Sequence, residues 1–334
     1  MPMSATRVPW QVKLSTLALI WGSSFLLMKV GLDDLHPVQI VTLRIVLAAV
    51  TLVLLLRVSG GRLPRGRRVW GHLFVCSLFL TVLPFTGFVT GELYVSSALA
   101  GIGNATTPIA TVLCALAILP SERLTSRKLL AVALGFVGVV VIAEPWNLTG
   151  RPDPLGFALV VLAATSYGLG WTYNRRTLAD VDLGGLAQPT ALLLCGTVAV
   201  VPLGLGWWLL GAGGRSAPWH LAGQDRATDA YPLWLSLGAV AVLGIVGTGL
   251  AYILQYDVVR AAGTVVGSTV TYLIPVVSVI LGVLVLGERL GPAQLVGFAI
   301  VLGAAIAVNR VPRTQIAAAP GGAPKVPVVE PGDR

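Results

Sequence analysis

Charged side chains in or beside long apolar stretches are the residues best placed to do chemistry, because a charge is costly in hydrocarbon. Arg44 lies seven residues after Pro37, which at a rise of ~1.5 Å per residue places it about 10 Å into an apolar segment. Lys29 and Glu92 end two other apolar segments on the same side. We expect a charged cluster in which Arg44 binds a carboxylate or phosphate, and Glu92 neutralises Arg44 when the site is empty. In the alternative, which we favour for Lys29, Lys29 and Glu92 only extend to the membrane interface.

Two prolines, Pro108 and Pro275, each follow a run of hydroxyl and amide residues within an apolar segment. Proline removes a helical hydrogen bond and frees a carbonyl group, so both helices are expected to kink, to border a central site and to flex during gating. Ser and Thr that only pack helices together are the alternative. The runs contain Asn104, Thr106 and Thr107 before Pro108, and Ser268, Thr269 and Thr271 before Pro275.

Aromatic residues near the centres of apolar segments form a third group of candidates. The O–H of Tyr and the N–H of Trp need partners inside a bilayer, which a polar cavity supplies. Packing against neighbouring helices is the alternative. This group contains Trp21, Tyr167, Trp171, Tyr252 and Tyr272. The predicted solute-binding or cavity-lining set is therefore Trp21, Arg44, Glu92, Asn104, Thr107, Tyr167, Trp171, Tyr252, Ser268, Thr271 and Tyr272, with Pro108 and Pro275 at the gating kinks.

Enzyme motifs are missing from the sequence. There is no GKS or GKT phosphate loop and no His-Glu-x-x-His, and neither the three histidines nor the three cysteines have metal-binding spacing. We therefore expect no cofactor, no metal and no enzymatic activity. A membrane-embedded enzyme or lipid-modifying protein is the second hypothesis, and a structural or assembly protein is the third. The residues concerned are His36, His72 and His220, and Cys76, Cys114 and Cys195.

The composition predicts that membrane helices position these residues. Apolar residues make up 55% of the chain and charged residues 11%, against about 25% charge in soluble domains. The apolar stretches are continuous over helix length rather than alternating, which predicts helices. The Pro-rich segment 309–334 is expected to be a disordered tail. Ten spans are predicted at about 14–31, 38–57, 70–91, 97–119, 127–144, 154–174, 185–210, 232–256, 262–286 and 291–308.

The basic residues lie between the apolar segments, where they set topology, so the net charge of +9 does not indicate nucleic-acid binding. With the N-terminal segment 1–13 placed inside, the inner segments hold 17 Lys and Arg and the outer segments hold 4. This bias predicts a multi-pass protein of the cell membrane with both termini in the cytoplasm.

The chain also resembles itself. Residues 21–32 align with 167–178, and the stretch from Pro108 to Glu122 aligns with that from Pro275 to Glu288. Each repeat, 14–144 and 154–308, contains five spans, and an odd number forces the second repeat into the opposite orientation. Inverted repeats around a central site are typical of secondary transporters that work by alternating access. A duplicated scaffold without transport is the alternative.

The motifs resemble those of the EamA-domain family of the drug/metabolite transporter superfamily, over about residues 12–308. The resemblance implies an all-α integral membrane fold of ten transmembrane helices in two inverted five-helix repeats, and export of amino acids or related small metabolites. It implies a small-molecule solute and a lipid bilayer as partners, and leaves proton coupling and facilitated export equally open. Pro120-Ser121 departs from the usual Leu-Gly, which is kept at Leu286-Gly287. The motifs are Leu19–Phe25, Leu43-Arg44-Ile45, Asn104–Pro108, Glu122–Thr125, Tyr272–Pro275 and Leu286–Leu290.

Overall fold

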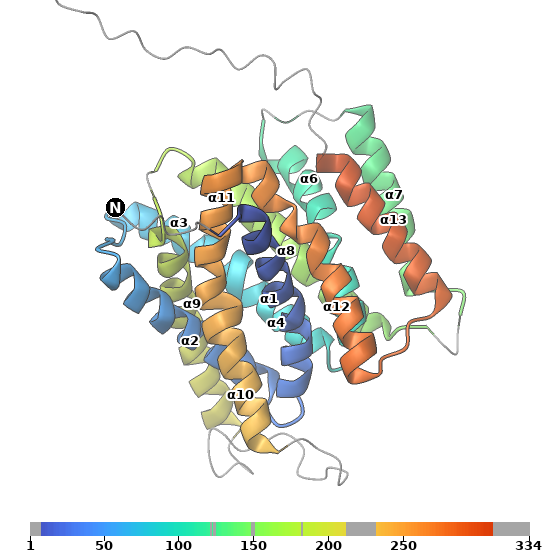
Figure 1. Ribbon diagram of the computed structural model, residues 1–334, viewed down its shortest axis with the longest axis horizontal. Helices are drawn as coiled ribbons and strands as arrows, with labels where there is room; N and C mark the ends of the chain where they lie inside the picture. Colours follow the sequence, from blue (N-terminus) through green and yellow to red (C-terminus); the bar gives the residue numbers. More distant parts are fainter. Residues whose placement is uncertain are drawn as a thin grey trace, which may run out of the picture.

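The computed structural model describes residues 8–120, 122, 125–147, 151–181, 183–211 and 232–309. Across these residues the regular secondary structure is entirely helical (Figure 1). The predicted disordered tail lies outside the described residues, apart from Asn309, which ends the last helix.

The first half of the chain forms five spans. Its helices are α1 (Trp10–Gly31), α2 (Pro37–Val58), a third span made of α3 (Arg67–Ser77), η1 (Leu78–Val82) and α4 (Leu83–Gly91), a fourth made of α5 (Ser97–Asn104) and α6 (Thr107–Ile118), and α7 (Ser126–Ala143).

The second half repeats this order. Its helices are α8 (Pro154–Leu178), α9 (Ala187–Leu210), a third span of α10 (Leu233–Gly244), η3 (Ile245–Leu250) and α11 (Ala251–Ser268), then α12 (Val270–Leu286) and α13 (Pro292–Asn309). Within the described ranges, seven helices are long and apolar enough to cross a membrane, and three shorter apolar helices complete the ten. The predicted ten-helix, all-α membrane fold is confirmed.

Side chains that cap free backbone amides begin several spans. The His36 side chain accepts a hydrogen bond from the Val38 amide, and Gln39 accepts one from the His36 amide. Ser96 and Asp153 cap α5 and α8 in a similar way. Gly287 ends α12 with a φ of 64°, a left-handed conformation that glycine adopts without strain. These local signals define where spans start and stop.

One predicted boundary is wrong. The sequence predicted a loop at 257–261 between the eighth and ninth spans, but α11 continues through it to Ser268 and the helix breaks at Thr269. Asp257 and Arg260 lower the hydropathy there, yet the segment contains no proline and no glycine before Gly263. Hydropathy reports polarity, whereas a helix ends where its backbone pattern is interrupted, so the polar residues did not end this helix.

A π-helical segment interrupts the third span of each half. The two segments are η1 and η3. Single π-turns are uncommon and often mark functional sites, because the widened turn displaces side chains and carbonyl groups. Their occurrence in the same span of both halves indicates that the repeats share backbone detail as well as helix number.

Several helices of each half pack against helices of the other half. α1 packs against α12 of the second half, and its counterpart α8 packs against α6 of the first. The equivalent helices α2 and α9 pair with each other, as do α7 and α13, which lie side by side at one edge of the molecule (Figure 1). This pattern is what two inverted five-helix repeats require, because a two-fold relation maps each contact onto its partner.

Candidate functional site

A cavity of about 600 Å³ lies between the halves. Its walls come from the first four spans of each half, whereas α7 and α13 contribute no described lining residue. The volume falls within the range of about 300–1,000 Å³ typical of small-molecule sites. The predicted residues brought together in its walls are Trp21, Arg44, Asn104, Thr107, Pro108, Tyr167, Trp171, Tyr252, Ser268, Thr271 and Tyr272. Glu92 and Pro275 do not line it.

Arg44 on α2 is the one charged residue among the described lining residues. Its side chain is buried, and Cζ lies 3.6 Å from the centre of the Phe85 ring, a cation–π contact. Nε donates to Thr248 Oγ1 at 3.1 Å, and Nη1 lies 3.6 Å from Met28 Sδ. No carboxylate in the described part of the chain lies within ion-pair distance of the guanidinium. The cavity therefore carries a positive charge that no described lining residue pairs.

The η3 turn orients the partner of Arg44. The Thr248 hydroxyl donates to the Leu243 carbonyl, five residues earlier, at 3.0 Å. With its proton committed there, the oxygen presents a lone pair to Arg44. The wide turn of the second half thus holds a hydrogen-bond acceptor against a cation supplied by the first half.

Aromatic rings form much of the wall. Trp21 and Tyr252 meet edge to face with centroids 6.5 Å apart, and Phe88 lies 6.1 Å from Tyr167. Tyr167 and Tyr252 line the same cavity as Arg44. The Tyr272 hydroxyl donates to the Ala305 carbonyl of α13, so its polar atom serves helix packing although the residue borders the cavity.

The two proline helices border the cavity differently. The fourth span of the first half breaks at Ala105–Thr106, and Pro108 occupies the first turn of α6, where its missing N–H costs nothing. The Thr107 hydroxyl donates to Asn104 Oδ1 across the break. Pro275 instead lies inside α12, beyond the break at Thr269. In the first half the break therefore interrupts the fourth span before its proline, whereas in the second half the break separates α11 from α12.

Glu92 lies apart from the cavity and does not extend to the interface. Its side chain is fully buried, and neither carboxylate oxygen has a hydrogen-bond partner among the described residues. Lys29 Nζ donates to the backbone carbonyls of Glu92, at 2.6 Å, and Val95, at 3.2 Å. No described hydrogen bond or ion pair joins the Glu92 carboxylate to Lys29, Glu288 or Arg44. The expected cluster is thus not held by side-chain contacts.

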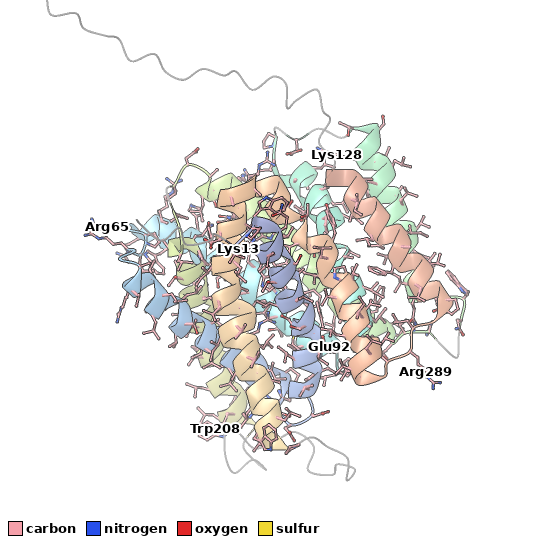
Figure 2. The ribbon with its side chains drawn as sticks, in the orientation of Figure 1. Lys13, Arg65, Glu92, Lys128, Trp208 and Arg289 are labelled. Carbon is pink, nitrogen blue, oxygen red and sulfur yellow. The ribbon has the colours of Figure 1, made fainter. Side chains whose placement is uncertain are left out.

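The cavity extends toward the end of the molecule at which α1 begins, where Lys13 pairs with Asp257 of α11. Gln188 at the start of α9 and Gln255, Tyr256 and Val259 of α11 line this part. Figure 2 shows Lys13 and Lys128 toward that end, and Glu92 and Arg289 toward the opposite end.

The opposite end is joined across the halves by Glu288, which follows α12. Its carboxylate accepts from the Ser97 amide at 2.7 Å and the Ala98 amide at 2.8 Å, so it caps the N-terminus of α5. The Ser278 hydroxyl adds a bond to the Ser97 carbonyl at 3.1 Å. These contacts hold α12 of the second half against α5 of the first.

The repeat counterpart of Glu288 makes other contacts. Glu122 pairs with Lys128 and Arg175 at 2.7 and 2.8 Å. Hydrogen bonds from Lys128 and then Arg175 lower the pKa of the Glu122 carboxyl. The two equivalent glutamates therefore serve different contacts at the two ends of the molecule.

Several lining residues were not predicted from the sequence. Gln188 and Gln255 are amides inside apolar segments, so the argument that selected Arg44 would have found them. Met28, Phe85 and Phe88 carry no such signal, because their side chains are indistinguishable from core residues. Thr248 needed knowledge of the π-turn. The remaining unpredicted lining residues include Ser24, Thr111 and Tyr256.

A profile of the EamA-like transporter family matches residues 9–143 and 154–310. The chain is 25% identical over 298 residues to the uncharacterized inner membrane transporter YedA of Escherichia coli strain K12, covering 89% of each chain. It is 25% identical over 288 residues to a protein named as a probable amino-acid metabolite efflux pump of the same strain, covering 86% of this chain and 90% of that protein.

A solved crystal structure has a similar fold, with a TM-score of 0.57 and 19% sequence identity over 91% of this chain and 98% of the other. The family and the relatives' names identify a multi-pass membrane transporter of small molecules rather than an enzyme.

Proposed function

The chain belongs to the EamA-like transporter family, and from this premise we propose that it is a secondary carrier that exports amino acids or related small metabolites by alternating access. The observation that carries the proposal is the cavity of about 600 Å³ bounded by equivalent helices of both halves. A site shared by two inverted repeats can be exposed to either side when one repeat moves against the other. The relatives named as amino-acid metabolite efflux pumps support the solute class.

In this mechanism, the repeats 14–144 and 154–308 are the moving units. Two helix breaks border the cavity. One lies at Ala105–Thr106, between α5 and α6, and the other lies at Thr269, just before α12. The cross-half contacts of Glu288 must separate for the cavity to open at that end. In this proposal the protein lies in the cell membrane with both termini in the cytoplasm. The cavity then opens toward the cytoplasm.

Counterflow in liposomes tests the proposal. Purified protein is reconstituted into vesicles loaded with an unlabelled solute, and entry of the same labelled solute is measured for a panel of amino acids and small organic metabolites. We expect transient accumulation of at least one solute that saturates with concentration. Protein-free vesicles provide the control. Failure of every solute to accumulate, with protein that remains monodisperse on extraction from the vesicles, contradicts the carrier function.

A further inference from the structure

We propose that the preferred solute is an amphipathic monoanion, with one singly charged acid group on an aromatic or branched apolar body and no cationic group. This proposal rests on the proposed carrier function and names the substrate class of the same cavity.

The acid group follows from Arg44. The side chain is only 7% exposed, yet it lines the cavity and has no carboxylate partner among the described residues. Its described hydrogen bonds use Nε and Nη1, which leaves the Nη2 donors for a ligand. A guanidinium fork matches a carboxylate or sulfonate in geometry as well as charge. An anionic solute thus supplies the counter-ion that the described lining residues do not provide for Arg44.

We expect the preferred solute to carry no cationic group, because the described cavity walls contain no carboxylate to pair with one. No Asp or Glu occurs among the described lining residues, and Glu92 lies outside the lining. An ammonium group entering the cavity would lose its water and gain no anionic partner, which is unfavourable in a medium of low dielectric constant. It would also be repelled by Arg44. A zwitterion is therefore bound less tightly than the matching anion.

The apolar body follows from the rings. Trp21, Phe88, Tyr167 and Tyr252 supply flat apolar faces in the walls of the same cavity. Apolar area buried against such faces adds affinity without further charge. The uncharged amides of Asn104, Gln188 and Gln255 can bind a single polar substituent.

Four ligands with one phenylpropyl body test the charge rule. They are 3-phenylpropanoate, phenylalanine, 3-phenylpropanamide and 3-phenylpropylamine, an anion, a zwitterion, a neutral compound and a cation. Binding is measured as the rise in thermal midpoint of the purified full-length protein, because a ligand bound only by the folded state raises its stability. The anion should stabilise most and the cation least. Equal or greater stabilisation by any of the other three, or none by the anion, overturns the proposal.

Variants locate the effect. Arg44→Gln should weaken anion binding about tenfold or more and leave binding of the neutral amide unchanged, and Arg44→Lys should restore part of the loss. Arg289→Gln removes an exposed arginine outside the cavity and should bind like the wild type. Thr248→Val, which removes the acceptor for Nε together with the hydroxyl's own bond to the Leu243 carbonyl, serves if Arg44→Gln does not fold, and should weaken anion binding severalfold. Unchanged anion affinity in a folded Arg44→Gln or Thr248→Val protein contradicts the proposal.

Failure of this proposal is distinct from failure of the carrier function. Counterflow of a zwitterionic or neutral solute without preference for anions leaves the carrier intact and removes the charge rule. Counterflow of no solute removes the carrier itself.

Discussion

Among the single residues, Glu92 places a carboxyl group in a fully buried position. A fully buried carboxyl group without a hydrogen-bond partner is costly when charged. Its charge is sensed by Lys29, Arg44 and Glu288, which come from both halves. In the proposed carrier, movement of the halves would change the surroundings of this buried group, and we therefore propose Glu92 as a residue that exchanges a proton during the transport cycle.

The first prediction therefore concerns Glu92→Gln, which keeps the shape and removes the titrating group. A pH gradient should drive net solute movement in the wild type and should not drive it in the variant. Counterflow at equal pH, which needs no net proton movement, should persist in both. The measurement is labelled solute uptake into vesicles with and without an imposed pH gradient. Insensitivity of the wild type to the gradient would show that Glu92 does not couple protons to transport.

Residues were predictable to the extent that a membrane makes polar groups conspicuous. Arg44, Asn104 and Tyr252 could be selected because each is chemically out of place in an apolar segment. Met28 and Phe85 contact the guanidinium but resemble ordinary core residues. The position of Glu92 near the end of a span suggested the interface, whereas tertiary packing buries it. The proposed roles of these residues stay predictions.

Among the helices, the cap that Glu288 places on α5 carries the clearest consequence. Two backbone amides at the start of α5 depend on a carboxylate from the other half. Charge-assisted hydrogen bonds to a helix N-terminus stabilise it, and loss of such bonds typically costs about 1–3 kcal/mol.

Glu288→Ala should accordingly lower the thermal midpoint by several degrees and weaken the closed end of the cavity. The midpoint is measured on purified protein, with Arg289→Ala as the neighbouring control, since Arg289 makes no described hydrogen bond or ion pair. A Glu288→Ala protein as stable as the control would mean that the cap contributes nothing to the folded state.

The pair α7 and α13 allows a matched test on one helix. A Cβ at Gly297 would lie 2.6 Å from Ile142 Cγ1 and 2.8 Å from the Gly138 carbonyl oxygen, whereas one at Gly303 meets nothing within 4 Å. Gly297→Ala should therefore separate the helices and destabilise by about 1–3 kcal/mol. Gly303→Ala should leave stability equal or higher, since alanine favours helix. Thermal unfolding of both proteins checks the opposite signs, and equal effects would exclude tight α7–α13 packing.

Helix positions were predictable where the length of an apolar stretch sets them. They were less predictable where the conformation of the backbone sets them. Nine of the ten spans begin within about four residues of their predicted starts, because apolar length sets a span. The ninth did not, because polarity at Asp257 and Arg260 lowered hydropathy without ending α11. The η1 and η3 turns leave no mark in hydropathy, and only the structure shows that η3 places Thr248 at the cavity.

At the scale of the whole molecule, charge distribution and repeat number predicted the architecture. The unequal distribution of Lys and Arg and the five spans per half both require an even number of helices in opposed sets. The fold agrees, because α2 pairs with α9 and α7 with α13. The sidedness of that architecture is still a prediction.

Reporter fusions test the sidedness. Green fluorescent protein fused after Arg334 should fluoresce in bacterial cells, and alkaline phosphatase fused at the same place should be inactive, because the C-terminus is predicted to be cytoplasmic. Fusions after Leu35, in the predicted first outer loop, should give the opposite pair of signals. Reversed signals at both sites would invert the assignment of inside and outside, and would turn the cavity opening outward.

The hydrogen bond from Arg44 to Thr248 also has a meaning for timing. It joins the helix that supplies the cation to the π-turn of the opposite half, and α9, the counterpart of α2, contains no charged residue. In the proposed carrier, an anion seated on Arg44 stays with the first half throughout the cycle. The second half, which carries the barrier that closes the cavity, then moves relative to a bound anion that hardly moves itself. Because this bond joins the two halves, it would have to break and form again in each transport cycle, while the bound anion remains on the Nη2 donors of Arg44.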